Sequence, residues 1–330
     1  MIIDIRTRIW TSLEQFGRET AERLRDRYAD RWSHLDGSPA AHEQAMSCVD
    51  IACVFGFRSA LMNAQVPNEL VAEFVARDPQ RRVGIAGIDP MLPSARDDLE
   101  QAVELGCVGV TISPASQGFH PAHSSAMRIY ERCDELGLPV FITHGLPLTP
   151  LAMLEFARPA ALDEVARSIP SLKLVVGELG HPWIDETIVL ISKHPHVYAD
   201  LSGVASRPWQ LYNALLTAAS YEVMDKLFFG SGFPLESPAK CIESLYLLNG
   251  FSHGTQLPSI PRSQIRGIIE RDSLRCLGIE CEANNRAGVN SAEHRNTLPD
   301  SLAESITTTH GSDTHQSDDE PEDDNGADRG

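Results

Sequence analysis

Two arginines stand one residue apart at the end of the first apolar segment, MIIDIRTRIW. Successive side chains of a β-strand alternate between its two faces, so Arg6 and Arg8 are predicted to point the same way. Two guanidiniums on one face are suited to holding a planar carboxylate, because each donates paired N–H bonds that lysine lacks. Burying them requires counter-charges, for which Glu178, Asp4 and Asp200 are the candidates.

Further polar residues follow other apolar segments of the chain. His181 is the first candidate for a general base, because imidazole titrates near neutral pH, and Glu178 is the second. His144, Asp200 and Arg207 are candidates for substrate binding beside the arginine pair. The other polar or small residues at predicted strand ends are Ser113, Thr143, Ser231 and Gly232.

Each of these residues also has an ordinary structural explanation. Arg6 and Arg8 are also consistent with surface residues at the end of a strand. His144 is also consistent with a structural histidine whose ring is hydrogen-bonded. Glu178 paired with an arginine is expected to have a lowered pKa, which makes it a weak base. Asp200, in the sequence ADLSG, fits hydrogen bonding at the end of a strand.

The elements that must position these residues follow from eight short apolar segments. They are residues 2–9, 49–57, 82–89, 108–113, 138–145, 172–178, 197–203 and 226–232. Amphipathic stretches lie between them, and the segments are apolar on both faces, which is typical of a parallel sheet covered by helices. Eight such repeats predict an α/β fold, the (β/α)8 TIM barrel, whose chemistry sits at the C-terminal strand ends. An open doubly wound sheet is the alternative, but no G-x-G-x-x-G follows the first strand.

Charge divides the chain into two parts. From Glu282 onward the chain has 12 acidic and 3 basic residues, a net charge of −9, and it ends in SDDEPEDDNGADRG. A segment of this composition without apolar periodicity cannot bury enough surface to fold. The sequence therefore predicts a barrel domain over residues 1–282 and a disordered acidic tail over residues 283–330. Within the barrel domain, residues 10–48 are predicted to form one charged helix and a loop.

Composition excludes several classes of protein. A share of 42% hydrophobic and 22% charged residues is typical of soluble globular proteins. No apolar run approaches a membrane span and the N-terminus carries no signal segment, so we expect a cytoplasmic location. Seven scattered cysteines without a C-x-x-C pair favour buried thiols over disulfides or a zinc site. We expect a small anionic molecule as partner and neither nucleic acid nor membrane, while a homo-oligomer is left open.

The predicted strand ends together resemble the amidohydrolase-related family, in the branch of aminocarboxymuconate-semialdehyde decarboxylase. The resemblance covers about residues 1–280 and rests on MIIDIRTRIW, GFHP, IYERCDELGLPVFITHG, LKLVVGELGHPWIDE, KHPHVYADLSG and KLFFGSGFPLESP. It implies a TIM barrel that acts as a hydrolase or decarboxylase on small carboxylated molecules. It also implies a divalent metal, usually zinc, that activates a water or polarises a carbonyl.

The resemblance assigns the family's functional positions one by one. The family has an H-x-H pair on strand one, a histidine on strand five, a catalytic histidine on strand six and an aspartate on strand eight. In this chain those positions hold Arg6 and Arg8, Thr143, Glu178 and Gly232, with His144 one residue beyond Thr143. Arginine has no lone pair for a metal ion and glycine has no side chain. We therefore expect no metal site and no cofactor; His144 is the one surviving ligand candidate, and zinc is the cofactor if the family's mechanism operates.

Three functions compete. The first is a metal-free binder of a small carboxylate or other anion, either a pseudoenzyme or an enzyme of altered chemistry, which the arginine pair favours. The second is an active hydrolase or decarboxylase of the amidohydrolase type, which the resemblance favours. The third is a non-catalytic scaffold that interacts through the barrel exterior and the acidic tail. Metal content discriminates the first two, and removal of the tail tests the third.

Overall fold

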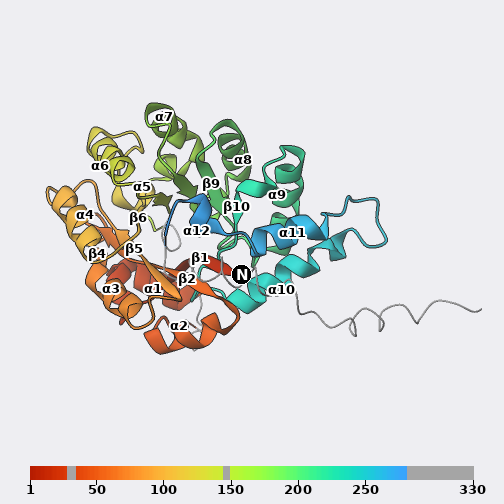
Figure 1. Cartoon of the computed structure of the whole chain (residues 1–330), viewed down its shortest axis with the longest axis horizontal. Coiled ribbons are helices and arrows are strands. Elements are labelled where there is room, and N and C mark those ends of the chain that lie inside the picture. The colour runs from red at the N-terminus through yellow and green to blue at the C-terminus, as the bar shows by residue number, and fades with distance from the viewer. Residues whose placement is uncertain (28–34, 144–148, 281–330) are drawn as a thin grey trace, which may run out of the picture. The chain divides into compact units, whose positions relative to one another are not determined.

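Eight parallel strands form a ring, in the order β1-β2-β5-β6-β7-β8-β9-β10, in the computed structural model (Figure 1). The model describes residues 1–27, 35–143 and 149–280. The strands are β1 (Ile3–Arg8), β2 (Ile51–Phe55), β5 (Arg82–Gly87), β6 (Gly109–Ile112), β7 (Val140–Ile142), β8 (Leu174–Val176), β9 (Val197–Asp200) and β10 (Leu227–Phe228). Backbone bonds join the two ends of this series, from Ile5 N to Phe229 O and from Arg8 N to Phe233 O, each 3.0 Å. The predicted (β/α)8 barrel is confirmed.

Helices surround the ring of strands, as Figure 1 shows. They are α1 (Arg18–Arg27), α2 (Pro39–Ala45), α3 (Asn68–Ala76), α4 (Ala95–Glu104), α5 (Pro114–Gln117), α6 (Ser124–Glu135), α7 (Leu162–Ser168), α8 (Ile184–Lys193), α9 (Pro208–Ser220), α10 (Pro238–Leu247), α11 (Arg262–Ile269) and α12 (Ser273–Cys276). The apolar faces of helices such as α6 and α8 pack on the outward side chains of the strands, whereas α12 packs against interior side chains at the end where the strands begin. Ile129 of α6 and Ile188 of α8, for example, join Val140 and Val176 in one buried cluster. Burial of this kind is the main favourable term in folding.

Residues 10–48 differ from the sequence prediction. Instead of one charged helix they contain α1 and, after residues 28–34, the separate helix α2. Ser38 caps α2 by accepting a bond from Ala41 N, and Pro39 occupies the first turn, where a missing N–H costs nothing. A hairpin of β3 (Phe57–Ser59) and β4 (Ala64–Val66) also follows β2. The sequence prediction missed this hairpin because it read residues 49–57 as one strand.

The barrel interior is apolar at the end where the strands begin. Ile3, Ile51 and Val83, at or near the starts of their strands, pack with Leu274 and Leu277 of α12. Lys173 anchors this helix region by donating from Nζ to Leu277 O at 3.0 Å. We call these five apolar residues the floor of the barrel. The floor closes the interior at this end, so any site lies at the other end.

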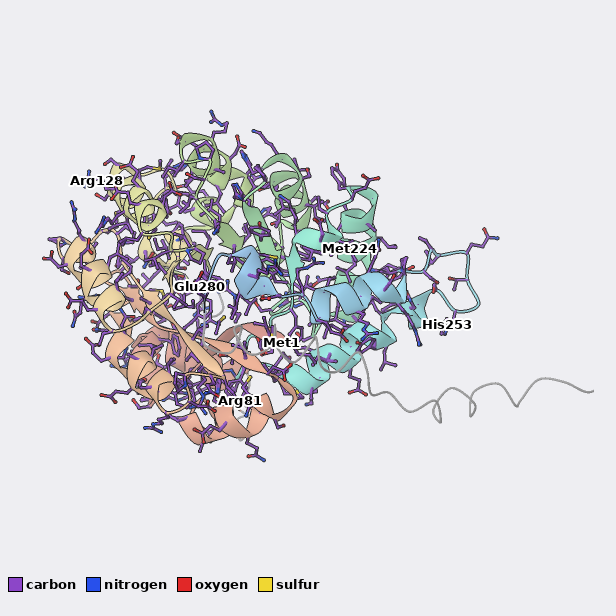
Figure 2. The ribbon with its side chains drawn as sticks, viewed as in Figure 1. Met1, Arg81, Arg128, Met224, His253 and Glu280 are labelled. Atoms are coloured by element: carbon purple, nitrogen blue, oxygen red, sulfur yellow. The ribbon has the colours of Figure 1, made fainter. Side chains whose placement is uncertain are left out.

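Side chains fill the space between strands and helices (Figure 2). Arg128 on α6 stands at the outer edge of the helix ring, and Glu280, the last described residue before the C-terminal segment, follows α12. No helix within the described residues is both long enough and apolar enough to cross a bilayer. The predicted tail, residues 283–330, lies outside the described residues.

Candidate functional site

A bulge in β1 sets the direction of the two arginines. Asp4 pairs with Ala52 of β2, but the next pairs are Thr7 with Val54 and Arg8 with Phe55. Two residues of β1, Ile5 and Arg6, therefore lie opposite one residue of β2, Cys53. A bulge of this kind changes the direction in which the side chains beyond it point. Ile5 belongs to the apolar interior cluster, and the contacts of Arg6 also lie inside the barrel.

Because of this bulge, Asp4 does not have the role that the sequence predicted for it. Plain alternation predicts that Asp4 shares a face with the arginines and neutralises one of them. Instead its carboxylate accepts bonds from the backbone amides of Arg6 (3.2 Å) and Ser231 (2.9 Å). It forms no ion pair with either arginine in the described part of the chain. Burial raises the pKa of Asp4 to about 7, although these amide bonds work against the shift.

Asp200, at the end of β9, supplies the counter-charge of Arg6. Nε of Arg6 donates to Oδ2 of Asp200 at 2.8 Å, and both side chains are fully buried. The other oxygen of Asp200 accepts bonds from the backbone amides of Glu178 (3.2 Å) and Ser202 (3.0 Å) and from the Ser202 hydroxyl. Asp200 thus ties β1 to the loops that follow β8 and β9. Buried charges are tolerated when they are paired and bonded in this way.

The guanidinium of Arg6 retains unused donors. Nη1 and Nη2 are buried and find no hydrogen-bond partner among the described residues. The group lies 4.8 Å from the ring centre of Phe55 and against Gly177, where a Cβ would come within 2.6 Å of Nη2. Only glycine fits beside this guanidinium. Unpaired buried donors are rare in proteins and mark a place where a ligand or ordered water supplies the missing acceptor.

Arg8 reaches across the barrel mouth to β7. Its Nη2 donates to Oγ1 of Thr143 at 3.2 Å, and only 4% of the residue is exposed. No carboxylate of the described residues lies within ion-pair distance of it. Burial, together with the charge of Arg6, lowers the pKa of Arg8 to about 10, so the guanidinium stays charged at neutral pH. Arg8 is therefore a buried cation that has a hydroxyl, but no anion, as its partner.

Glu178 lies close to both arginines without pairing with either. It follows β8 in a short 3₁₀ turn, Gly177–Gly180, and its charge interactions are with Arg8 first, then Arg6, Asp200 and Arg207. The sequence analysis expected an ion pair that lowers the pKa of Glu178, and this expectation is wrong. Burial outweighs the attraction of the arginines and raises the pKa.

His181 and Arg207 form a pair at the rim. Nη1 of Arg207 lies 2.7 Å from Nε2 of His181. Because a guanidinium only donates, Nε2 accepts, and the imidazole is neutral. Burial and the charge of Arg207 lower the pKa of His181 accordingly. In this arrangement the lone pair that a general base needs is occupied by Arg207.

The positions that the resemblance assigns to metal ligands do not fit a metal ion. Arg6 and Arg8 fill the barrel mouth with guanidiniums, which have no lone pair to donate. Thr143 bonds to Arg8, and Gly232 donates its backbone N–H to Arg6 O at 3.0 Å. Within residues 1–27, 35–143 and 149–280 no three His, Cys, Asp or Glu side chains gather in a way that could hold a metal. His144 lies outside the described residues.

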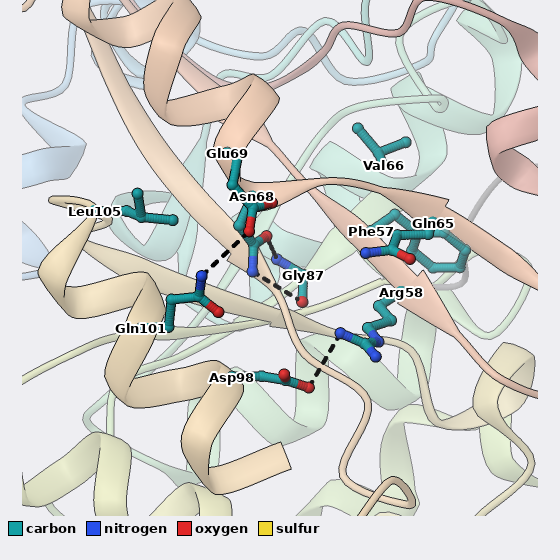
Figure 3. Close-up of a pocket in the computed structure, with 10 residues that line it drawn as sticks. All are labelled: Phe57, Arg58, Gln65, Val66, Asn68, Glu69, Gly87, Asp98, Gln101 and Leu105. Carbon is teal, nitrogen blue, oxygen red and sulfur yellow. Dashed lines mark hydrogen bonds and ion pairs between the residues drawn. The ribbon is translucent and has the colours of Figure 1, made fainter. Parts of the chain in front are cut away.

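Hollows also lie on the outer side of the barrel, and two of them border residues named in the sequence analysis or the β3–β4 hairpin. One, of about 660 Å³, runs between α8 and α9 from His181 past Trp183 and Trp209. The other lies between the hairpin β3–β4, α3 and α4 (Figure 3). It measures only about 30 Å³, which suits water rather than a substrate. Its charged groups are satisfied internally, with Nη1 of Arg58 3.2 Å from Oδ2 of Asp98.

Sequence reasoning missed two residues of the mouth. Gly177 and Phe55 shape the space around the Arg6 guanidinium, yet neither type carries chemistry of its own. The sequence signal for Gly177 is its place inside the predicted buried strand 172–178, where a glycine often marks a close approach by another group. Phe55 has no such signal, because an aromatic residue in a buried strand is an ordinary core residue.

The comparisons with known proteins agree with this architecture. A family model described as Amidohydrolase matches residues 3–255. A curated 2-amino-3-carboxymuconate-6-semialdehyde decarboxylase from Dictyostelium discoideum is 32% identical over 106 residues, which are 30% of this chain and 29% of that protein. The matched region thus spans less than a third of that relative.

Solved structures give the same fold. An uncharacterized TIM-barrel protein from Bordetella bronchiseptica has a TM-score of 0.65 and 20% identity, covering 84% of this chain and 98% of that chain. A dihydroxybenzoic acid decarboxylase from a Polaromonas species, with bound manganese and the inhibitor 2-nitroresorcinol, has a TM-score of 0.61 and 18% identity. It covers 84% of this chain and 96% of its own. At these identities the likeness establishes the barrel alone.

Proposed function

The chain belongs to the amidohydrolase family, and we propose that it binds a small carboxylate at the barrel mouth through Arg8 and Arg6, without a metal ion. The observation that carries the proposal is the state of Arg8, a buried cation without an anionic partner among the described residues. A buried charge of this kind is costly unless an opposite charge joins it. A carboxylate ligand supplies that charge.

The charges at the mouth favour an anion. Arg6 and Arg8 bring two positive charges, and Asp200 neutralises the first of them through its ion pair. Glu178 is the next carboxyl, and it forms no ion pair with either arginine among the described residues, while burial raises its pKa. A ligand carboxylate beside Arg8 can accept two parallel N–H···O bonds from the guanidinium, one at each of its oxygens. The free Nη1 and Nη2 of Arg6 are further donors for the same ligand or for water.

A metal ion is not part of this proposal. The dihydroxybenzoic acid decarboxylase of the same fold was solved with bound manganese and an inhibitor. In this chain the mouth carries guanidiniums, which have no lone pair for a metal ion. In this reading the two organic cations take over the electrostatic role of the ion.

An active decarboxylase or hydrolase is the second candidate. The family match and the name of the curated relative favour it. Glu178 adds to it, because a carboxyl whose pKa is raised by burial is a suitable proton donor. In a decarboxylation the electron pair of the broken bond stays on the substrate carbon, and in this candidate Glu178 delivers the proton that this carbon takes up. Turnover of a carboxylated substrate by the metal-free protein is the result that would support this candidate.

Thermal unfolding with and without malonate tests the binding proposal. Malonate at about a hundred times its Kd should stabilise the protein by about 2.7 kcal/mol, and added salt should weaken the effect. Arg8→Met should abolish the shift. Arg266→Met is the matched control, because Arg266 pairs with Glu270 on the exposed face of α11. The proposal fails if malonate leaves the wild type unchanged, or if folded Arg8→Met keeps the full shift.

A further inference from the structure

The turn that carries Glu178 has an unusual backbone. Glu178 (φ 55°, ψ 27°) and Leu179 (φ 50°, ψ 28°) both adopt the left-handed conformation, and Gly180 follows with φ 65°. A residue with a side chain is seldom found there, and two in succession are rarer still. Strain of this kind persists where the surrounding structure requires a particular side-chain position. The backbone of this turn therefore points to a fixed position for the Glu178 side chain.

The strained turn fixes Glu178 at two points. Its backbone N–H donates to Oδ1 of Asp200 at 3.2 Å, the same aspartate that holds Arg6. Its side chain lies over Gly203, with Cγ 3.5 Å and Oε2 3.8 Å from the position that a Cβ on Gly203 would take. A Cβ at Gly203, where φ is 69°, would therefore be in ordinary van der Waals contact with Glu178. The turn thus holds the Glu178 side chain against the loop that follows β9.

The carboxyl has cations around it and bonds to none of them. The charged groups that face it are Arg8 and Arg6 from β1, Asp200 from β9 and Arg207 from the loop before α9. His181 is the partner of Arg207 and is neutral in that contact. Within the described residues, the carboxyl oxygens of Glu178 form no hydrogen bond and no ion pair. Among the described residues Arg8 likewise has the hydroxyl of Thr143 as its hydrogen-bond partner and no carboxylate within ion-pair distance, so both groups lack a charged partner.

We propose, resting on the carboxylate site proposed above, that Glu178 is the selectivity residue of that site and takes up one proton for each carboxylate that binds. The ligand carboxylate lies against Arg8, and the protonated Glu178 donates an O–H···O bond to it. Two carboxylates that share one site do not both stay ionised, because their charges repel. The proton comes from solvent and goes to a carboxyl oxygen of Glu178, and no bond of the ligand changes.

This coupling has a consequence for ligand choice. A site that supplies its own proton donor favours a ligand whose group at this position accepts hydrogen bonds. The burial that raises the pKa of Glu178 supports the coupling, because it lowers the cost of the protonated form. Above the pH at which free Glu178 loses its proton, affinity should fall by about tenfold per pH unit, since one proton must be restored for each ligand.

Calorimetric titration with malonate at several pH values tests the inference. Malonate stays a dianion from about pH 7 to pH 9, so any proton uptake belongs to the protein. We expect the Kd of the wild type to increase with pH. The slope of this increase should approach about tenfold per pH unit in the upper part of this range. Glu178→Gln keeps a hydrogen-bond donor without a titrating group, so its Kd should be independent of pH. Glu270→Gln, an exposed ion-pair residue on α11, is the control and should keep the wild-type slope.

A second measurement on the wild type covers the case in which Glu178→Gln does not fold. Binding enthalpies in Tris and in triethanolamine at the same pH give the number of protons taken up per malonate. A number near one at about pH 8 supports the inference. A number near zero there, or a pH slope that Glu178→Gln retains, overturns it while leaving the anion site intact. Absence of malonate binding by the folded wild type at every pH overturns the anion site itself.

Discussion

The floor and the mouth of the barrel interior differ in how their side chains are satisfied. At the floor, Ile3, Ile51 and Val83 pack with Leu274 and Leu277, and no charge is involved. Three and five residues after Ile3 in the same strand, β1 carries two buried arginines. One of them is paired with Asp200 and the other has no anion within reach in the described structure.

The floor contributes to the stability of the fold, whereas the mouth is the region where we expect a ligand to bind. Apolar burial at the floor is complete within the chain, so it contributes to folding without reference to anything else. The mouth keeps groups that the described residues do not fully satisfy, namely Nη1 and Nη2 of Arg6, which have no hydrogen-bond partner there, and Arg8, which has a hydroxyl but no carboxylate within ion-pair distance there. Natural proteins retain such groups chiefly where a ligand completes them. Substitutions in the mouth should therefore have effects that depend on charge, pH and ligand.

The largest effect should follow from removal of the counter-charge at the mouth. Asp200→Asn leaves Arg6 buried without its anion, which should lower the free energy of unfolding by about 3–5 kcal/mol. Ile5→Val in the neighbouring apolar cluster should cost only about 0.5–1.5 kcal/mol. Urea unfolding of both variants measures the two values. An Asp200→Asn variant as stable as Ile5→Val would show that the pair matters no more than ordinary packing.

A pH-dependent effect should follow at Asp4. Its pKa is about 7 in the folded protein and 3.8 when unfolded, so the folded state holds the proton more tightly. Stability should therefore fall as pH rises from about 4 to 7, by up to about 1.4 kcal/mol per pH unit, and stay level above. Asp4→Asn, which cannot ionise, should lack this fall. Unfolding curves of the wild type and of Asp4→Asn, measured across this pH range, test the prediction. If the stabilities of the two proteins change with pH in parallel, Asp4 is not the group responsible.

A smaller effect should follow at Gly177. A Cβ there would lie 2.6 Å from Nη2 of Arg6 and 2.8 Å from Ile142 O, so Gly177→Ala should cost about 1–3 kcal/mol. It should also weaken malonate binding, because the guanidinium must move. Gly250→Ala is the control, since nothing lies within 4 Å of its Cβ position. If both variants unfold at the same urea concentration, Gly177 does not position Arg6.

The ring of strands was predictable from sequence, whereas the contacts between side chains at the mouth were only partly so. Eight apolar segments separated by amphipathic stretches have few arrangements other than a barrel. The strand ends also indicated Arg6, Arg8, Glu178 and Asp200 as neighbours. The bulge that turns Asp4 away from them has no sequence signal, because no glycine or proline marks it.

The pKa of Glu178 was mispredicted for a similar reason. Sequence places a carboxyl near an arginine, but it does not give the distance or the depth of burial. In the structure the two groups remain beyond ion-pair distance, and burial becomes the larger influence on the carboxyl. The strained turn that holds Glu178 is likewise invisible in GELG, where only the final glycine favours a left-handed backbone.

Elemental analysis of protein purified without chelator tests the central claim most directly, namely that two guanidiniums stand where a metal ion would otherwise act. We predict well under one equivalent of zinc, iron or manganese per chain, and malonate binding that EDTA does not change. One tightly held metal ion per chain would contradict the account, because Arg6 and Arg8 could not then be the cations of the site.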